Sequence, residues 1–377
     1  MLDVFASGFS GLISGFLHLS MPNIIMIVIG GILLFLGIKK DFEPLLLVPI
    51  GFGCILVNIP LADLMEPGGF LRTIYEAGIM TELFPLLIFV GIGAMTDFEP
   101  VLENPITFLL GAAGQFGIFL TLALALALGF KELEAVSIGI IGACDGPTAI
   151  YVTSQYAPHL LGAVSVAAYS YMSLVPLIQP PIMRALTTEK ERTTVMKAHK
   201  KTVSPTTKLL FPLVITILGG LIAPKGLPLL GTIMLGNLMR ESGAVERLTK
   251  ASQNEIANVV TLLLGISIGA TMDGRVFLQP QTLIVLCLGF IAICLDTACG
   301  VLLGKVLYVF TGGKVNPLIG ACGISAFPMA GRLSARMAQD EDYENFILMH
   351  AMGANTAGQL GSVIAGGLLL ALVAGMI

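Results

Sequence analysis

Long, nearly uncharged apolar blocks constrain this chain more than any other feature of its sequence. A helix needs about 20 mainly apolar residues to cross a membrane. Only 12% of the residues are charged, against about 25% in a soluble domain. We therefore predict an all-α polytopic membrane protein without a nucleic-acid partner, and we exclude a soluble globular protein, a disordered chain and a secreted disulfide scaffold. The apolar blocks lie at about 21–38, 44–62, 83–96, 105–130, 135–152, 160–183, 209–223, 226–239, 256–271, 280–304, 316–331 and 346–376.

Two of these blocks are interrupted by glycine, proline and polar residues. The first interruption, at 142–150, reads Gly-Ala-Cys-Asp-Gly-Pro-Thr-Ala-Ile, and the second, at 316–332, runs from Asn316 to Arg332. Irregular backbone at membrane depth is tolerated only where it is buried in protein or lines a wet cavity. We therefore predict a broken or re-entrant helix at each interruption.

The chain also repeats itself in the same order. The run Ile-Gly-Ala at 92–94, followed by Asp97, matches Ile-Gly-Ala at 268–270, followed by Asp273. Gly-Ala-Cys at 142–144 matches Gly-Ala-Cys at 320–322, and Asn58 matches Asn237. The three matches have nearly the same spacing, which indicates two homologous halves. We assign them to 21–183 and 209–377, after an interfacial or transmembrane helix within 1–20.

A basic stretch at 184–208 separates the two halves, and the positive-inside rule makes it cytoplasmic. Threading the chain outward from this loop, with both interrupted segments re-entrant, places four basic residues outside: Arg72, Lys131, Lys225 and Arg275. In this threading the first helix of one half runs inward and that of the other runs outward. The halves are then inverted repeats, as in many secondary transporters, which bind substrate and ions between the repeats.

Asp145 is the strongest candidate for chemistry, because a carboxylate inside a membrane block marks a functional site by default. The helix break around Thr148 frees oxygen atoms that, with the carboxylate, suit a hard cation. The alternative is a carboxyl group hydrogen-bonded to a neighbouring helix end. Asp296 is equally central but lies in an unbroken block, so a structural role and an ion role stay equally open.

The second half adds neutral oxygens and one cation. Asn316 and Ser325 in the interrupted segment, and Asn355 in the last block, offer oxygens that suit Na⁺. Arg332 has a planar fork that could anchor an anion, or it is simply a residue of the positive-inside rule. Tyr171 is a phenol deep in its block that could hold or donate a proton, although many membrane tyrosines are interfacial. These residues lead to a cation-coupled transporter and no further.

The interrupted segments also carry a family resemblance. Gly-Ala-Cys-Asp-Gly-Pro-Thr-Ala-Ile-Tyr at 142–151, the pattern from Asn316 through Gly320 and Ser325 to Arg332, Tyr-Ser-Tyr-Met at 169–172 and Gly-Ala-Asn at 353–355 resemble the β subunit of the biotin-dependent, sodium-pumping decarboxylases. Members of that family act on oxaloacetate, methylmalonyl-CoA, glutaconyl-CoA or malonate. The resemblance covers essentially the whole chain.

The resemblance implies a fold of two inverted repeats related to sodium–citrate symporters. It implies an enzyme that decarboxylates carboxybiotin and uses the free energy to drive Na⁺ out of the cell. Asp145, Asn316 and Asn355 would be sodium ligands, with Thr148 beside them. Gly320 and Ser325 would belong to a sodium or proton path, Tyr171 would supply a proton, and Arg332 would engage carboxybiotin.

The resemblance also implies partners and a location. They are a biotin carrier subunit, a carboxyltransferase α subunit, a small membrane-anchoring subunit and two further β subunits in a trimer, in a bacterial or archaeal cell membrane. The compact chain favours the acyl-CoA branch over the oxaloacetate branch. The alternative function is a secondary Na⁺–dicarboxylate symporter without enzymatic activity, which composition and repeats fit equally well.

Overall fold

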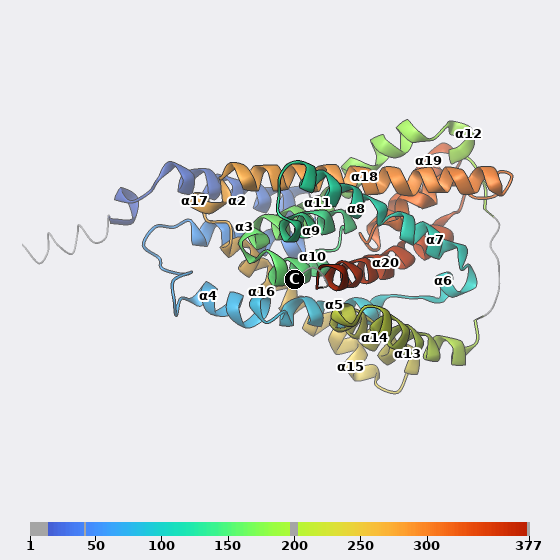
Figure 1. Cartoon of the computed structure of the whole chain (residues 1–377), viewed down its shortest axis with the longest axis horizontal. Helices are drawn as coiled ribbons and strands as arrows, with labels where there is room; N and C mark the ends of the chain where they lie inside the picture. Colours follow the sequence, from blue (N-terminus) through green and yellow to red (C-terminus); the bar gives the residue numbers. More distant parts are fainter. Residues whose placement is uncertain (1–13, 41–42, 197–202, 375–377) are drawn as a thin grey trace, which may run out of the picture.

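The computed structural model describes residues 14–40, 43–196 and 203–374, and these residues form helices and loops without any strand (Figure 1). Within these ranges six helical stretches are long and apolar enough to cross a membrane, or seven if the bent pair at 70–80 and 83–95 is one span. The all-α, multi-pass architecture is thereby confirmed. Most of the predicted helix within 1–20 lies outside the described residues.

The first half contains ten α-helices within the described residues. A π-helix, η1 (Glu76–Met80), follows α4, and a 3₁₀ helix, η2 (Ile140–Ala143), follows α9. The α-helices are α2 (Met21–Lys40), α3 (Pro44–Val57), α4 (Phe70–Tyr75), α5 (Leu83–Met95), α6 (Glu99–Glu103), α7 (Ile106–Ala113), α8 (Phe116–Ala127), α9 (Glu132–Gly139), α10 (Gly146–Tyr156) and α11 (Leu161–Leu186).

The short α12 (Glu189–Arg192) lies between the halves, and the second half repeats much of the order of the first. Its π-helix, η5 (Ser252–Ile256), follows α15, and its 3₁₀ helix, η6 (Pro317–Gly323), follows α18. Its α-helices are α13 (Pro205–Ile222), α14 (Leu227–Ser242), α15 (Glu246–Ala251), α16 (Ala257–Ala270), α17 (Gly274–Phe277), α18 (Pro280–Phe310), α19 (Met329–Glu341) and α20 (Leu348–Ala374).

The two halves contact each other in a reciprocal way. Helix α3 packs against α16, and its counterpart α14 packs against α5, the counterpart of α16. The amide nitrogen of Asn58 donates to the carbonyl of Met272 at 2.8 Å, and that of Asn237 donates to the carbonyl of Thr96 at 3.2 Å. Met272 and Thr96 each precede the aspartate of the repeated sequence motif. Such reciprocity is the pattern that a two-fold relation produces.

The helical path breaks at both predicted interruptions. In the first half the path stops at Cys144, which has a left-handed backbone (φ 52°), and it resumes at α10 after the extended Asp145. In the second half η6 ends at Gly323, and extended backbone leads to α19. The two breaks meet, because the backbone N–H of Ser325 donates to the carbonyl of Ala143 at 3.0 Å.

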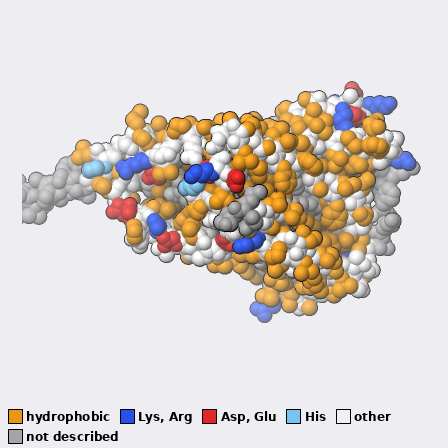
Figure 2. Space-filling view, viewed as in Figure 1, with side chains coloured by type: hydrophobic (Ala, Val, Ile, Leu, Met, Phe, Trp, Pro, Cys, Tyr) orange, Lys and Arg blue, Asp and Glu red, His pale blue; other side chains and the backbone are white. Residues whose placement is uncertain are grey.

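The surface fits a lipid environment. Helix α13 is exposed along most of its length, although it is strongly apolar. Figure 2 shows hydrophobic side chains over most of the visible face in its right half. Since a soluble monomer rarely exposes so much contiguous apolar surface, the exposed helices indicate contact with lipid or with other membrane chains.

Accessibility labelling tests the threading of the chain. A cysteine introduced at Lys190, in the exposed region after α11, should react with an impermeant maleimide only from the cytoplasmic face. A cysteine introduced at Arg72, in α4, should react only from the opposite face, since the threading puts an odd number of crossings between them. Right-side-out and inverted vesicles supply the two orientations. Labelling of both positions from one side would contradict the inverted-repeat arrangement.

Candidate ion and substrate site

Asp145 lies at the junction of the first break and α10, where its side chain caps the helix. Its carboxylate is 3% exposed. Oδ1 accepts the backbone N–H of Thr148 at 3.3 Å, and Oδ2 accepts the Thr148 hydroxyl at 2.9 Å. An aspartate is a favoured cap because it satisfies N–H groups that the first helical turn leaves unpaired. The capping explains the orientation of the carboxylate.

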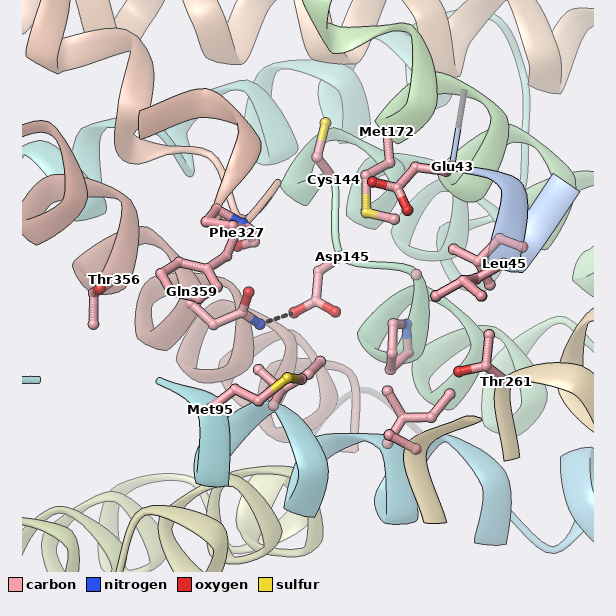
Figure 3. Close-up of a pocket in the computed structure, with 18 of the residues that line it drawn as sticks. Glu43, Leu45, Met95, Cys144, Asp145, Met172, Thr261, Phe327, Thr356 and Gln359 are labelled. Atoms are coloured by element: carbon pink, nitrogen blue, oxygen red, sulfur yellow. Dashed lines mark hydrogen bonds between the residues drawn. The ribbon is translucent and has the colours of Figure 1, made fainter. Parts of the chain in front are cut away.

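The last helix of the chain holds the other side of this carboxylate. From α20, Gln359 Nε2 donates to Asp145 Oδ2 at 3.1 Å, and Ser362 Oγ donates to the same oxygen at 2.8 Å. Figure 3 shows Gln359 reaching toward Asp145. The two donors come from the second half of the chain, so the site is assembled between the halves.

The second break is held by side chains that bind its backbone carbonyls. Asn355 Nδ2 donates to the carbonyls of Cys322 and Ile324 at 3.1 and 2.8 Å, and Gln115 Nε2 donates to the carbonyl of Gly323 at 2.9 Å. The Ser325 hydroxyl donates to the carbonyl of Gly358 at 2.9 Å. Since buried carbonyls outside helices need partners, these bonds fix the irregular segment in place.

A cavity of about 700 Å³ opens beside the two breaks. Asp145, Tyr169, Ser325, Arg332 and Gln359 line it, together with a larger number of apolar residues. Figure 3 shows Asp145 and Gln359 in this cavity, with the apolar Leu45 and Met95. Its volume lies in the range of about 300–1,000 Å³ that is typical of small-molecule sites, which combine apolar walls with a few convergent polar groups. The cavity is therefore a candidate site for both an ion and an organic substrate.

Arg332, in the first turn of α19, is the cationic side chain of this cavity. It is exposed, and no side-chain hydrogen bond or ion pair holds it among the described residues. The neighbouring Arg336 is also exposed but does not line the cavity. An anion that enters the cavity would therefore meet Arg332.

Two sequence-predicted site residues, Asn316 and Gly320, lie elsewhere. Asn316 caps η6 through the N–H of Leu318, and its amide donates to the carbonyls of Arg192 and Thr194 at 2.8 and 3.0 Å. Gly320 allows η6 to approach the backbone of α18 at Gly300, where a Cβ would clash. Neither lines the cavity, and their roles as sodium ligand and path residue stay predictions.

Tyr171 also points away from the cavity. Its hydroxyl donates to the carbonyl of Leu286 in α18 at 2.6 Å, and its ring packs edge-on against Phe290. In this conformation the phenol holds α11 to α18. Its predicted role as proton source stays a prediction.

Asp296 is buried outside the cavity. Its carboxylate lies against Gly117 and Gly142, where a Cβ on either residue would clash with it. Its oxygens face the start of α8 without a short hydrogen bond to any described residue. The two glycines, one at the start of α8 and one in η2, explain how the acid fits there.

The structure adds three residues that sequence reasoning missed: Tyr169, Gln359 and Ser362. A signal for two of them was present. Asn355, Gln359 and Ser362 stand at i, i+4 and i+7 in an apolar block, which places them on one face of a helix. A polar stripe of this kind inside a membrane helix must face protein rather than lipid.

A known protein family and several known proteins match this chain over nearly its whole length. The family model described as Na⁺-transporting oxaloacetate decarboxylase beta subunit matches residues 22–373. Glutaconyl-CoA decarboxylase subunit beta of Acidaminococcus fermentans is 50% identical over 99% of this chain and 100% of that protein. Methylmalonyl-CoA decarboxylase subunit beta of Veillonella parvula is 50% identical over 99% of each chain.

A third relative belongs to the oxaloacetate branch. Oxaloacetate decarboxylase beta chain of Klebsiella pneumoniae is 47% identical over 96% of this chain and 98% of that protein. The site with its buried Asp145, its two broken helices and its cavity arginine thus occurs in a chain that resembles decarboxylase β subunits from end to end. The chain belongs to the β-subunit family of the Na⁺-transporting decarboxylases.

Proposed function

We propose that this chain decarboxylates carboxybiotin, which a biotin carrier subunit delivers, and couples the reaction to outward Na⁺ transport. The observation that carries the proposal is the cavity at the two breaks, which combines the buried carboxylate of Asp145 with the guanidinium of Arg332. The first group suits a cation and the second suits a carboxylated substrate. Na⁺ and carboxybiotin would thus bind in the same cavity.

Arg332 would bind the carboxylate of carboxybiotin. A guanidinium presents two parallel N–H donors to a carboxylate, and Arg332 has no competing partner in the described part of the chain. Decarboxylation breaks the bond between the carboxylate carbon and the ureido nitrogen, and the electron pair stays on that nitrogen. The nitrogen then takes up one proton, so each CO₂ released consumes one proton.

Asp145 would hold Na⁺ during the cycle. The carboxylate is fixed by donors from α10 and α20, which are parts of opposite halves, so a relative movement of the halves would change the site. The described residues contain no group of three or more His, Cys, Asp or Glu side chains that is arranged to hold a metal ion. The remaining ligands would therefore be neutral oxygens, which suit Na⁺, and Ser325 and Asn355 lie at the adjoining break.

Inverted repeats are part of the proposal. The reciprocal contacts of Asn58 and Asn237 support a two-fold relation. Figure 1 supports an inverted relation between the halves. Helices α7 and α8 of the first half run from right to left, whereas α18 of the second half runs from left to right. The threading of the chain puts Arg332 on the cytoplasmic side, where a mobile carrier domain would arrive.

The primary substrate would be an acyl-CoA. The alignment with the Klebsiella pneumoniae beta chain extends over 423 positions, more than the 377 residues of this chain, whereas the glutaconyl-CoA relative aligns over 376.

The remaining proposed partners are a carboxyltransferase α subunit, a small membrane-anchoring subunit and two further β subunits, in a cell membrane. The decarboxylase names of the relatives argue against a secondary symporter.

Avidin capture of the native, detergent-solubilised complex tests the proposed partner and substrate. The proposal expects a biotinylated protein to be retained together with this chain and to be eluted with it. The eluted complex should release CO₂ from glutaconyl-CoA or methylmalonyl-CoA, and more slowly or not at all from oxaloacetate. Capture of a biotinylated protein without this chain would contradict the proposal.

Arg332→Lys should impair decarboxylation of the carboxylated carrier by about 10-fold or more, since an ammonium lacks the bidentate fork and a charged hydrogen bond contributes about 1.5–3 kcal/mol. Arg336→Lys on the same helix is the matched control and should leave the rate unchanged, because Arg336 lies outside the cavity. The measurement is CO₂ release from purified complexes. Equal rates in the two variants would exclude Arg332 from substrate binding.

A further inference from the structure

Tyr169 has a buried phenol whose hydroxyl finds no hydrogen-bond acceptor in the described part of the chain. The side chain lies in α11 and is 2% exposed, and its oxygen forms no hydrogen bond with any described residue. A buried polar group without a partner lowers the stability of a protein, so each such group in a native structure calls for an explanation. An ordinary packing role would not require a hydroxyl at this position.

The hydroxyl end of this ring lies beside the acid of the site. A Cβ added to Gly146 would clash with Tyr169 Cζ, so the ring rests directly on the glycine that follows Asp145. Asp145, Gly146 and Tyr169 all line the same cavity. Glycine at position 146 is thus the residue that lets the phenol approach the carboxylate.

Only one oxygen of the Asp145 carboxylate accepts several short hydrogen bonds. Oδ2 accepts hydrogen bonds from Thr148, Gln359 and Ser362 at 2.8–3.1 Å. Oδ1 accepts a single, longer bond of 3.3 Å from the N–H of Thr148. Oδ1 of Asp145 and the hydroxyl oxygen of Tyr169 therefore keep unused lone pairs, and both residues line the same cavity.

Other tyrosines of α10 and α11 differ in this respect. Tyr156 donates to the carbonyl of Leu370 at 2.8 Å, and Tyr171 donates to the carbonyl of Leu286 at 2.6 Å. Tyr151 reaches the carbonyl of Lys225 at 3.5 Å. Of these four tyrosines, Tyr169 is the one whose hydroxyl has no hydrogen-bond partner among the described residues. It is also the one of the four that lines the cavity.

We propose that the Tyr169 hydroxyl oxygen is a ligand of the cation that binds at Asp145. The inference rests on the proposed function, which places Na⁺ at that carboxylate. Na⁺ is a hard cation that prefers oxygen ligands, and a neutral phenol oxygen adds coordination without adding charge. With the cation bound, both under-used oxygens gain a partner.

The test compares Tyr169→Phe with the wild type in the native, detergent-solubilised complex. Thermal unfolding is followed while NaCl replaces choline chloride at constant ionic strength, because a ligand that binds the native state raises its apparent stability. The Na⁺ concentration that gives half of the stabilisation should rise about 10-fold or more in Tyr169→Phe. In choline chloride alone, Tyr169→Phe should melt at the wild-type temperature or above it, since the change removes an unpaired hydroxyl.

Tyr156→Phe is the matched control, because it removes a hydroxyl that is bonded to a carbonyl away from the cavity. Its half-stabilising Na⁺ concentration should equal that of the wild type. Gly146→Ala is a second test variant, since its methyl group would push the Tyr169 ring aside, and it should weaken Na⁺ stabilisation in the same direction.

Two outcomes would overturn the inference in different ways. An unchanged half-stabilising Na⁺ concentration in Tyr169→Phe, with stabilisation lost in Asp145→Asn, would remove Tyr169 from the site and leave the proposed function intact. A wild-type complex that Na⁺ does not stabilise at all would contradict the proposed sodium site itself and the ligand role with it.

Discussion

Asp145→Asn is expected to abolish Na⁺-dependent decarboxylation. The substitution keeps the size of the side chain but removes its charge, and its NH₂ group would face at least one of the donors from Thr148, Gln359 and Ser362. Loss of one partner of a buried charge interaction costs about 2–5 kcal/mol, and 3 kcal/mol corresponds to roughly a hundredfold in affinity. The rate of CO₂ release as a function of Na⁺ concentration measures the effect.

The same variant should lose a competition between Na⁺ and protons. A proton and Na⁺ would both bind the carboxylate of Asp145, so the apparent Na⁺ affinity of the wild type should increase as the pH rises. Asp145→Glu moves the carboxylate by about one methylene and should retain, at most, weakened coupling.

Asp340→Asn, an exposed change on α19, is the control and should behave like the wild type. Full Na⁺ dependence in Asp145→Asn, with an unchanged pH profile, would make Asp145 a structural acid. The cation site would then have to be sought at Asp296.

Gly358→Ala is expected to destabilise the second break. A Cβ at Gly358 would clash with the backbone carbonyl of Gly323, and the carbonyl of Gly358 accepts the Ser325 hydroxyl at 2.9 Å. Overpacking of a tight core costs about 1–3 kcal/mol, and more where backbone must move. We expect a lower unfolding temperature and a large loss of activity, because the break at 324–328 would be pushed from its place beside Asp145.

Gly231→Ala is the matched control for this substitution. Gly231 also lies in a helix, α14, but a Cβ there would meet no atom within 4 Å. Alanine favours the helix over glycine by up to about 1 kcal/mol, so the control should unfold at the wild-type temperature or slightly above it. Equal unfolding temperatures in the two variants would show that the second break tolerates displacement.

Much of the architecture could be predicted from sequence because membrane helices have a strong and simple signal. Apolar blocks mark where the apolar helices lie, and the interruptions by glycine and proline at 142–150 and 316–332 lie where the helices break. The repeated Ile-Gly-Ala motifs lie at the ends of α5 and α16, and the repeated Gly-Ala-Cys motifs lie at η2 and η6. The positions of the helices along the chain could therefore be predicted from the local sequence alone.

The details of the site were harder to predict, because they depend on how distant helices meet. Asp145 stood out as a lone acid, but Gln359 and Ser362 approach it from a helix more than 200 residues away. Tyr169 and Tyr171 illustrate this dependence on packing. Both lie in one short motif, and only the packing of α11 against α10 and α18 shows that the first lines the cavity and the second contacts a carbonyl.

Sodium transport driven by decarboxylation is the most direct test of the central claim. The native complex is reconstituted into proteoliposomes, and ²²Na⁺ uptake and CO₂ release are measured together after addition of an acyl-CoA substrate. We expect both to occur, avidin to stop both, and Asp145→Asn to stop both in an otherwise intact complex. Na⁺ uptake that proceeds with a dicarboxylate gradient and without CO₂ release would contradict this claim.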